Sequence, residues 1–425
     1  RNAGRYRLAA LDAPAPGHPH QAERPRLLSP FTLTGQDQMP TIDRIDGYAD
    51  ELTAIRRDLH AHPEIGFEEV RTSGIVADKL REFGCDEVVT GIGRTGVVGV
   101  IKGRGQGDRA IGLRADMDAL PLTEITGKPW ASTTEGRMHA CGHDGHTAML
   151  LGAAKYLAET RTFHGNVVVI FQPAEEGGRG ALAMVEDGLM ERFGIEEVYG
   201  MHNHPGMKVG SFATRRGSVM AAADQFDIEI HGRSGHAAQP HKSIDPVLAA
   251  AQVVVALQSI AARETDPLNS VVVTVTKIHG GDAYNVIPDG VKLSGTVRTL
   301  LPELRDMAEK RLSEIATGIA MAMGARAEVR YHRGYPVTFN HHAETDFALD
   351  VLRKVAGAQA VSDEFPPAMG AEDFSYMLEA RPGAFVFIGN GDTANLHNSA
   401  YDFNDEAIPY GISYWVTLAE TALAT

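Results

Sequence analysis

Apolar residues recur with two different periods along the chain. From about residue 42 to residue 222, short apolar runs alternate with segments of helical period, which predicts strands and helices in turn. The predicted elements are a helix through 52–59 that ends near 62, helices 72–83 and 145–159, and strands 96–101, 110–115, 166–171 and 197–201. Because residues 166–171 form an almost continuous apolar run, we expect a strand buried on both faces. This part of the chain therefore predicts an α/β domain with a mixed sheet.

A second pattern begins near residue 222. Residues 225–230 alternate polar and apolar positions, as an antiparallel strand with one solvated face does. Helices are predicted at 245–262 and 301–323, and strands at 270–278, 290–298 and 325–332. The order strand-helix-strand-strand-helix-strand predicts a ferredoxin-like split βαβ unit. We therefore expect an α/β sandwich at residues 223–336, inserted into a larger domain formed by residues 39–222 and 337–425, whose return includes a helix at 343–356 and a strand at 384–388.

The first 38 residues differ from the rest of the 425-residue chain. They are rich in Pro, Ala, Arg and His, with neither an amphipathic period nor a long apolar run, and Met39 follows them. We expect a disordered extension or a mis-assigned start, and no secretory signal.

Charge and cysteine content exclude several kinds of partner. The net charge of -15 and the pI of about 5.6 argue against nucleic acid and against an anionic membrane surface. No apolar run approaches the roughly 20 residues that span a bilayer, so no membrane segment is expected. Cys85 and Cys141 are the only cysteines, which excludes a disulfide framework. These features favour a cytoplasmic protein.

The segment 138–146 (MHACGHDGH) carries the densest chemical signal. Cys141 and His143 lie two residues apart, so a thiolate and an imidazole can face the same side of an extended loop and share a metal ion. The alternative is a lone cysteine buried as a small hydrophobe. Three histidines and an aspartate in the same segment disfavour that alternative.

Further donors follow predicted strands. Glu175 and Glu176 come directly after the strand 166–171, where ligands bind in open α/β sheets. Because neighbouring side chains of an extended segment point in opposite directions, one glutamate can bind metal while the other faces a water molecule. His202 and His397 also follow strands. Each histidine alone is more often a surface or core residue, but together with Cys141, His143 and Glu176 they suffice for two metal ions that share a bridging ligand.

The sequence resembles the aminoacylase and carboxypeptidase family of dinuclear metallohydrolases, in particular its hippurate hydrolase and auxin-conjugate hydrolase branch. The resemblance extends from about residue 42 to the C-terminus. The matching stretches are 59–64 (LHAHPE), 113–121 (LRADMDALP), 141–146 (CGHDGH), 172–176 (QPAEE), 235–238 (GHAA), 285–288 (NVIP), 295–298 (GTVR), 370–374 (GAEDF), and 396–397 with 401–403.

The resemblance assigns roles to individual residues. It implies that Cys141, His143, Glu176, His202 and His397 bind metal, and that Glu175 is the general base. It further implies that the inserted domain is a lid that carries the contact of a homodimer. His236 then reaches the partner subunit's active site and stabilises the oxyanion, and Asn285 and Arg298 hold the substrate.

One departure concerns residues 114–116. Many relatives have a metal-binding His-x-Asp motif where this chain has Arg114, Ala115 and Asp116. In this branch the Cys-x-His loop replaces that histidine ligand. The change of ligand leaves more than one metal compatible with the site. Cys85 follows Gly84 in a turn without donor neighbours, so we interpret it as a structural residue. We interpret His60 and His62 as residues at the end of a helix and not as ligands.

The expected activity is metal-dependent hydrolysis of N-acyl-L-amino acids, small hippurate-like molecules, to a carboxylate and a free amino acid. Two divalent ions per subunit are expected: Zn²⁺ or Mn²⁺, with Co²⁺ or Ni²⁺ also compatible with mixed N, O and S donors. The same chemistry would serve a dipeptidase, a carboxypeptidase or an N-acetyl-diaminopimelate deacetylase. A non-catalytic metal-binding scaffold is the alternative of another class, and it has no use for a base such as Glu175.

Overall fold

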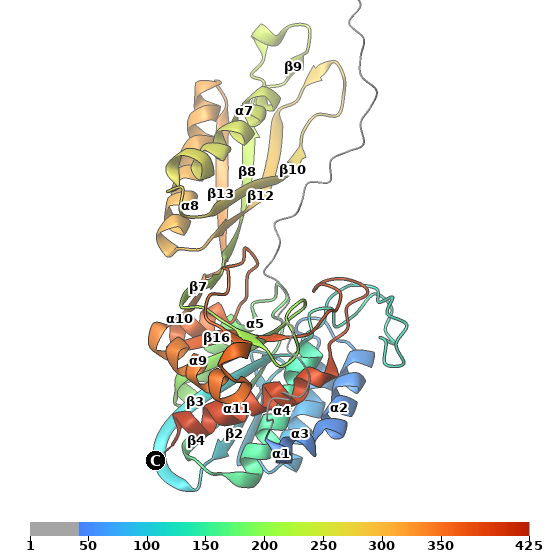
Figure 1. Ribbon diagram of the computed structural model, residues 1–425. Helices are drawn as coiled ribbons and strands as arrows, with labels where there is room; N and C mark the ends of the chain where they lie inside the picture. Colours follow the sequence, from blue (N-terminus) through green and yellow to red (C-terminus); the bar gives the residue numbers. More distant parts are fainter. Residues whose placement is uncertain (1–41, 425) are drawn as a thin grey trace, which may run out of the picture. The chain divides into compact units, whose positions relative to one another are not determined.

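The computed structural model describes residues 42–424, so the disorder predicted for residues 1–38 lies outside the described residues. Within the described part, the main sheet has eight strands in the order β1-β2-β4-β3-β5-β16-β6-β15 (Figure 1). Their bounds are β1 Glu87–Ile92, β2 Gly96–Lys102, β3 Gly105–Asp116, β4 His164–Gln172, β5 Ile195–His204, β6 Phe212–Ala213, β15 Val361–Ser362 and β16 Gly383–Gly389. Neighbouring strands among β4, β3, β5 and β16 are parallel, and so are β6 and β15. The pairs β1–β2, β2–β4 and β6–β16 are antiparallel. The predicted α/β fold with a mixed sheet is confirmed.

Helices cover both faces of the main sheet. Alternate residues of β4 enter two different cores: Val167 and Val169 pack in one, and Val168 and Ile170 in the other. The first core includes side chains from α1 Asp43–Asp46, α2 Ala49–Ala61, α3 Val70–Glu82, α4 His143–Thr160, α9 His342–Ala356 and α11 Ile408–Ala422. The second includes side chains from α5 Gly180–Glu186, α6 Leu189–Arg192 and α10 Ser375–Ala380. Burial on both faces explains why the central strands are continuously apolar.

Helix α4 lies at the centre of the first core, between α2 and α11 (Figure 1). Most of its residues are buried, including His143, Asp144 and His146 in its first turn. Helix α11 was not predicted from the sequence. Most of its residues, Trp415 among them, are buried, and the helix packs on α4 and α9.

A second sheet has the order β10-β12-β8-β13. Its strands are β8 Ala222–His231, β10 Val271–His279, β12 Gly290–Thr299 and β13 Arg326–Tyr335, all paired antiparallel. Helices α7 Pro246–Ser259 and α8 Pro302–Ala322 pack on it around a separate apolar core. The Asp245 carboxylate caps α7 by accepting from the backbone N–H groups of Val247 and Leu248. The connectivity β8-α7-β10-β12-α8-β13 is that of a split βαβ unit.

Short elements complete the described chain. The remaining strands form two ribbons, β9 Gly235–His236 with β11 Val286–Ile287, and β7 Gly217–Met220 with β14 Thr338–Asn340. Short 3₁₀ turns occur at η1 Pro240–Lys242, η3 Ala358–Ala360 and η4 Asp405–Ala407, and a π-helical turn, η2 Ile260–Glu264, extends α7.

One expectation about apolar runs was wrong. Among the described residues, Pro246–Glu264 forms one continuous helical segment that is long and apolar enough to cross a bilayer, with a mean hydropathy of 1.4. The sequence predicted this helix at 245–262, but its strictly apolar runs are short because Gln252 and Gln258 interrupt them. In the structure, Ala249, Val253 and Leu257 of this segment pack into the core of the second sheet.

Candidate metal centre

The candidate donors gather at the carboxyl ends of the four central parallel strands. Asp116 ends β3, and Glu175 and Glu176 follow β4. His202 lies near the end of β5, and His397 follows β16 after a loop. Because the carboxyl ends of parallel strands meet at one edge of a sheet, residues more than 200 positions apart become neighbours.

Cys141, from the loop before α4, and His143, the first residue of α4, enter this region together. Gly142 between them has a φ of 87°, and a Cβ there would lie 2.3 Å from Asn203 Nδ2 and 2.4 Å from the Tyr401 hydroxyl. Asn203 Nδ2 donates to the Cys141 carbonyl at 2.6 Å, and Tyr401 donates to Asn203 Oδ1 at 2.8 Å. Only glycine fits this close approach, so the loop holds Cys141 and His143 in a fixed relation.

The predicted donors lie within coordination reach of one another. One donor atom each from Cys141, Glu176 and His397 lies within 4.8 Å of the other two, and the same holds for His143, Glu175 and Glu176. Cys141 Sγ is 3.3 Å from His202 Nε2, and His397 Nε2 is 3.0 Å from Glu176 Oε1. Glu176 belongs to both groups, which is the arrangement that a shared ligand between two ions requires.

Hydrogen bonds fix the tautomers of two histidines. His143 Nδ1 donates to the Asp118 carbonyl at 2.9 Å, and His202 Nδ1 donates to the Asn203 carbonyl at 2.7 Å. Because Nδ1 is occupied in both rings, Nε2 is the nitrogen that can bind metal. His143 Nε2 is buried and lacks a hydrogen-bond partner among residues 42–424, being 3.6 Å from Asp116 Oδ2. A carbonyl that orients one ring nitrogen while the other stays open is typical of metal-binding histidines.

The charge of the region also fits cations. Of the described residues here, Asp116, Asp118, Glu175, Glu372 and Asp373 are buried carboxylates. The buried guanidinium of Arg114 contacts three of them, Asp116, Glu372 and Asp373. Such an excess of buried negative charge is costly unless cations compensate it. Burial, and next the charge of Glu176, raise the pKa of the Cys141 thiol, so a thiolate here also requires a neighbouring cation.

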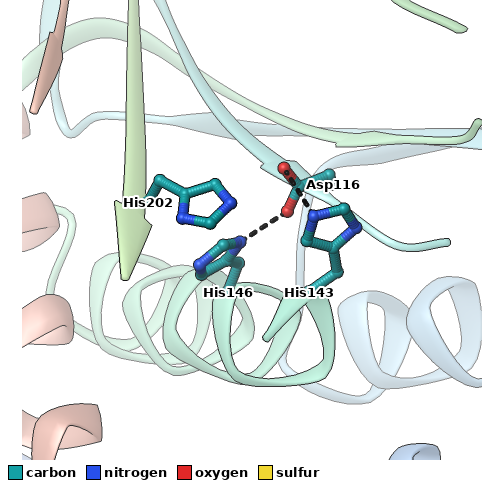
Figure 2. A group of neighbouring side chains, drawn as sticks. All are labelled: Asp116, His143, His146 and His202. Carbon is teal, nitrogen blue, oxygen red and sulfur yellow. Dashed lines mark hydrogen bonds and ion pairs between the residues drawn. The ribbon is translucent and has the colours of Figure 1, made fainter. Parts of the chain in front are cut away.

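Asp116 and His146 are best explained as supports for the donors. Figure 2 shows Asp116 between His143 and His146, opposite His202. His146 Nδ1 donates to Asp116 Oδ1 at 2.6 Å, and its Nε2 accepts from the Asn203 backbone at 2.9 Å, so both ring nitrogens are used. Asp116 Oδ2 accepts from Arg114 at 2.9 Å. Sequence reasoning gave these two residues no role; the end of a buried strand was the signal for Asp116.

A cavity of about 470 Å³ opens beside the donors. Its described lining includes Cys141, Glu175, Glu176, His202 and His397. The three residues that the resemblance places on a lid, His236, Asn285 and Arg298, are not part of this lining. His236 is exposed and pairs with Val286 in the β9–β11 ribbon, and the Asn285 carbonyl accepts from Ala237 in the same ribbon. Arg298 is half-buried on β12, where it contacts Thr296. The roles of these three residues stay predictions.

Two histidines interpreted as helix-end residues differ in the structure. His62 is partly exposed, and its Nδ1 donates to the Asp58 carbonyl at 2.8 Å, as expected at the end of α2. His60 is fully buried, and its Nδ1 lies 2.8 Å from Asp144 Oδ2 in the first turn of α4. His60 therefore braces the helix that begins with His143, which its sequence neighbours did not reveal.

Comparison with known proteins assigns the chain to a family. Residues 112–421 match peptidase family M20/M25/M40. The chain belongs to this family. It is 45% identical over 369 residues to hippurate hydrolase from Campylobacter jejuni, a match that covers 87% of this chain and 96% of that protein. It is 41% identical to N-acetyl-L-cysteine deacetylase from Bacillus subtilis, with 89% of this chain and 91% of that protein covered.

A solved structure agrees. The Bacillus subtilis YXEP protein, described as a dinuclear metal binding peptidase from the M20 family, superposes with a TM-score of 0.79 at 36% identity. The match covers 89% of this chain and 99% of that one. Membership of this family makes the chain a metal-dependent hydrolase, as the sequence predicted.

Proposed function

We propose that this M20-family hydrolase cleaves the amide bond of N-acyl-L-amino acids and releases a carboxylate and a free amino acid. The observation that carries the proposal is that two donor groups share Glu176, one of them with the buried Glu175, and that Cys141, Glu175, Glu176, His202 and His397 line one cavity. Hippurate hydrolase and N-acetyl-L-cysteine deacetylase, both at least 41% identical to the chain, support this substrate class.

Five residues hold the metal in this proposal: Cys141, His143, Glu176, His202 and His397. Two divalent ions bound there would supply Lewis acidity toward water and toward the amide carbonyl. Zn²⁺ and Mn²⁺ are the first candidates, and Co²⁺ and Ni²⁺ also suit a set of one thiolate, one carboxylate and three imidazoles.

Glu175 acts as the general base. It takes a proton from the attacking water at its carboxylate and returns that proton to the leaving nitrogen. Burial first, and then the carboxylate of Glu372, raise the pKa of Glu175 above that of an ordinary glutamate. The Asp373 backbone N–H donates to Glu175 Oε1 at 3.3 Å and orients it. A base with a raised pKa is suited to accept and return a proton near neutral pH.

We further propose that the second sheet with α7 and α8 is a lid and the contact of a homodimer. Helix α7 supports this, because Leu248, Ala251 and Val255 form an exposed apolar stripe and the helix contains no charged residue. In this dimer, His236 reaches the partner's site to stabilise the oxyanion, and Asn285 and Arg298 hold the substrate. We assign the enzyme to the cytoplasm, where its two free cysteines stay reduced.

The test combines metal analysis with a substrate panel. The protein is assayed on N-acyl amino acids, dipeptides and N-acetyl-diaminopimelate, before and after removal of metal by a chelator. We expect hydrolysis of N-acyl amino acids, loss with the chelator, and recovery with a divalent ion.

Cys141→Ala should lower bound metal and rate together, whereas the matched control Cys85→Ala should keep both, because Cys85 is outside every candidate donor group of residues 42–424. Full metal content and rate in Cys141→Ala, or activity on dipeptides alone, would contradict the proposal.

A further inference from the structure

The backbone around Glu176 forms a tight turn. The Gly177 N–H donates to the Glu175 carbonyl at 2.7 Å, which closes a three-residue turn with Glu176 in the middle. The general base and the shared metal ligand proposed above therefore lie on the same short turn. The conformation of this turn decides where both carboxylates point.

A tyrosine from the second sheet binds both ends of the turn. The Tyr335 hydroxyl donates to the Glu175 carbonyl at 2.5 Å and accepts from the Gly177 N–H at 2.8 Å. Burial, and next the charge of Asp373, raise the pKa of Tyr335, so the hydroxyl keeps its proton and can donate. One side chain thus bridges the two peptide groups that flank Glu176.

Other supports of the same loop come from elements of the main sheet and its helices. The Glu69 carboxylate accepts from the Ala174 N–H at 2.8 Å, and the Asp118 carboxylate accepts from the Glu176 N–H at 2.9 Å. Glu69 directly precedes α3, and Asp118 follows β3. Tyr335, by contrast, is the last residue of β13. It therefore joins the second sheet to the turn.

The residue before Tyr335 is anchored in the second sheet. The Gly334 N–H donates to Asp224 Oδ1 at 2.9 Å, and the Gly334 carbonyl accepts from Arg305 Nη2 at 3.0 Å. Asp224 on β8 and Arg305 on α8 form a buried ion pair. A Cβ on Gly334 would lie 2.0 Å from the Ala223 carbonyl oxygen, so only glycine allows this close approach. Tyr335 thus reaches the turn from a firmly bonded part of the second sheet.

We infer that Tyr335 is a positioning residue for hydrolysis, whose hydroxyl fixes the turn that carries Glu175 and Glu176 from the strand β13. The inference rests on the proposed function, in which Glu175 is the base and Glu176 the shared ligand. Without the hydroxyl, the two peptide groups beside Glu176 lose their link to β13, and both carboxylates are free to shift. A misplacement of about 1 Å in reacting groups can lower a rate by about 10²-fold.

The test removes the hydroxyl and keeps the ring. For metal-saturated Tyr335→Phe protein acting on N-benzoylglycine, we expect kcat to fall by about tenfold or more, while KM stays within about twofold of the wild-type value. A loss confined to kcat is the result that distinguishes misplaced reacting groups from weaker substrate binding.

The matched control is Tyr376→Phe. The Tyr376 hydroxyl donates to the Gly334 carbonyl at 2.9 Å, and the rings of Tyr376 and Tyr335 meet with centroids 6.1 Å apart. This control therefore removes a hydroxyl beside the same strand while it leaves both hydrogen bonds of Tyr335 to the turn in place. Its kcat should stay at the wild-type value.

Hydrogen exchange tests the contact without substrate. Gly177 is exposed, so hydrogen bonds and not burial protect its amide. In metal-loaded protein followed by mass spectrometry, Tyr335→Phe should speed the exchange of this amide by about fivefold or more, and Tyr376→Phe should not.

Three results would overturn the inference: an unchanged kcat or unchanged exchange in folded Tyr335→Phe protein, or an equal loss of kcat in Tyr376→Phe. Failure of the wild type to hydrolyse N-acyl amino acids would instead overturn the proposed function. The exchange rate of the Gly177 amide would then decide the role of Tyr335 alone.

Discussion

Glu175 and Glu176 are adjacent and have the same side chain, but their surroundings shift their pKa values in opposite directions. Burial and nearby carboxylates raise the pKa of Glu175. Burial also raises the pKa of Glu176, but the hydrogen bond from His397 and the charge of His143 outweigh it, so the net pKa is lowered. Ala174, with a φ of 49°, turns the chain just before the pair. Two carboxylates with opposite pKa shifts suit two roles, the base and the metal ligand.

This difference predicts the effect of Glu175→Gln. The substitution keeps the shape of the side chain and removes the proton acceptor, so we expect kcat to fall by roughly 10²–10⁴-fold. Bound metal, measured by elemental analysis, should stay at the wild-type level. The matched variant Glu176→Gln should lose metal as well as rate. A Glu175→Gln enzyme with wild-type kcat would exclude Glu175 as the base.

At the scale of elements, buried ion pairs join α2 to the first turn of α4 and to Asp405. Arg56 Nη1 lies 3.4 Å from Asp144 Oδ2, and Arg56 Nε donates to Asp405 Oδ1 at 2.7 Å. His60 contacts Asp144 from the same helix. Burial lowers the pKa of His60, but the charge and hydrogen bond of Asp144, together with Glu124, raise it to about 9. The first turn of α4, where His143 lies, is thus braced from α2.

The raised pKa of His60 predicts a pH-dependent stability. Because the folded-state pKa lies above the ordinary value of 6.5, the contribution of protonated His60 is complete below that pH and is lost as the pH rises through about 9. At its largest it amounts to about 3 kcal/mol. Thermal unfolding of metal-free wild type and His60→Gln, followed from about pH 6 to about pH 10, should show a stability difference that shrinks with rising pH. A difference independent of pH would contradict the ion pair.

Helix α7 has a second, exposed face. Val255 on this face is 70% exposed. Val70 on α3 is 72% exposed and serves as the control. If α7 forms the proposed dimer contact, Val255→Glu places an unpaired charge in the interface. We expect its dimer dissociation constant, measured by sedimentation, to rise about tenfold or more. Val70→Glu should leave the constant unchanged. Equal dissociation of the two variants would exclude this face of α7.

At the scale of the whole molecule, the proposed dimer makes each site depend on two chains. His236 is exposed, and the cavity lining contains no residue of the β9–β11 ribbon among those described. A mixture of His236→Ala and Glu175→Gln chains therefore tests the arrangement. When subunits exchange, a mixed dimer has one site with both groups intact, so activity should return toward half of the wild-type value for each mixed dimer. Complete exchange without recovered activity would mean that His236 does not act across the dimer.

The sequence by itself determined the order of the elements and the predicted donor set. A buried strand shows as a continuous apolar run, and the carboxyl ends of parallel strands meet at one edge of a sheet, so Glu175, Glu176 and His202 could be assigned to one region before any coordinates. The spacing of Cys141 and His143 is a local property and was equally readable.

Only the tertiary structure decided which polar residues support the donors and what surrounds the substrate. Asp116 and His146 are hydrogen-bonded to each other. His60 is buried because α2 packs on α4. Beside the donors, the ring of Phe365 from a loop meets the rings of His204 and Phe387 from two neighbouring strands. Such contacts depend on side chains far apart in the sequence, and no local period or spacing encodes them.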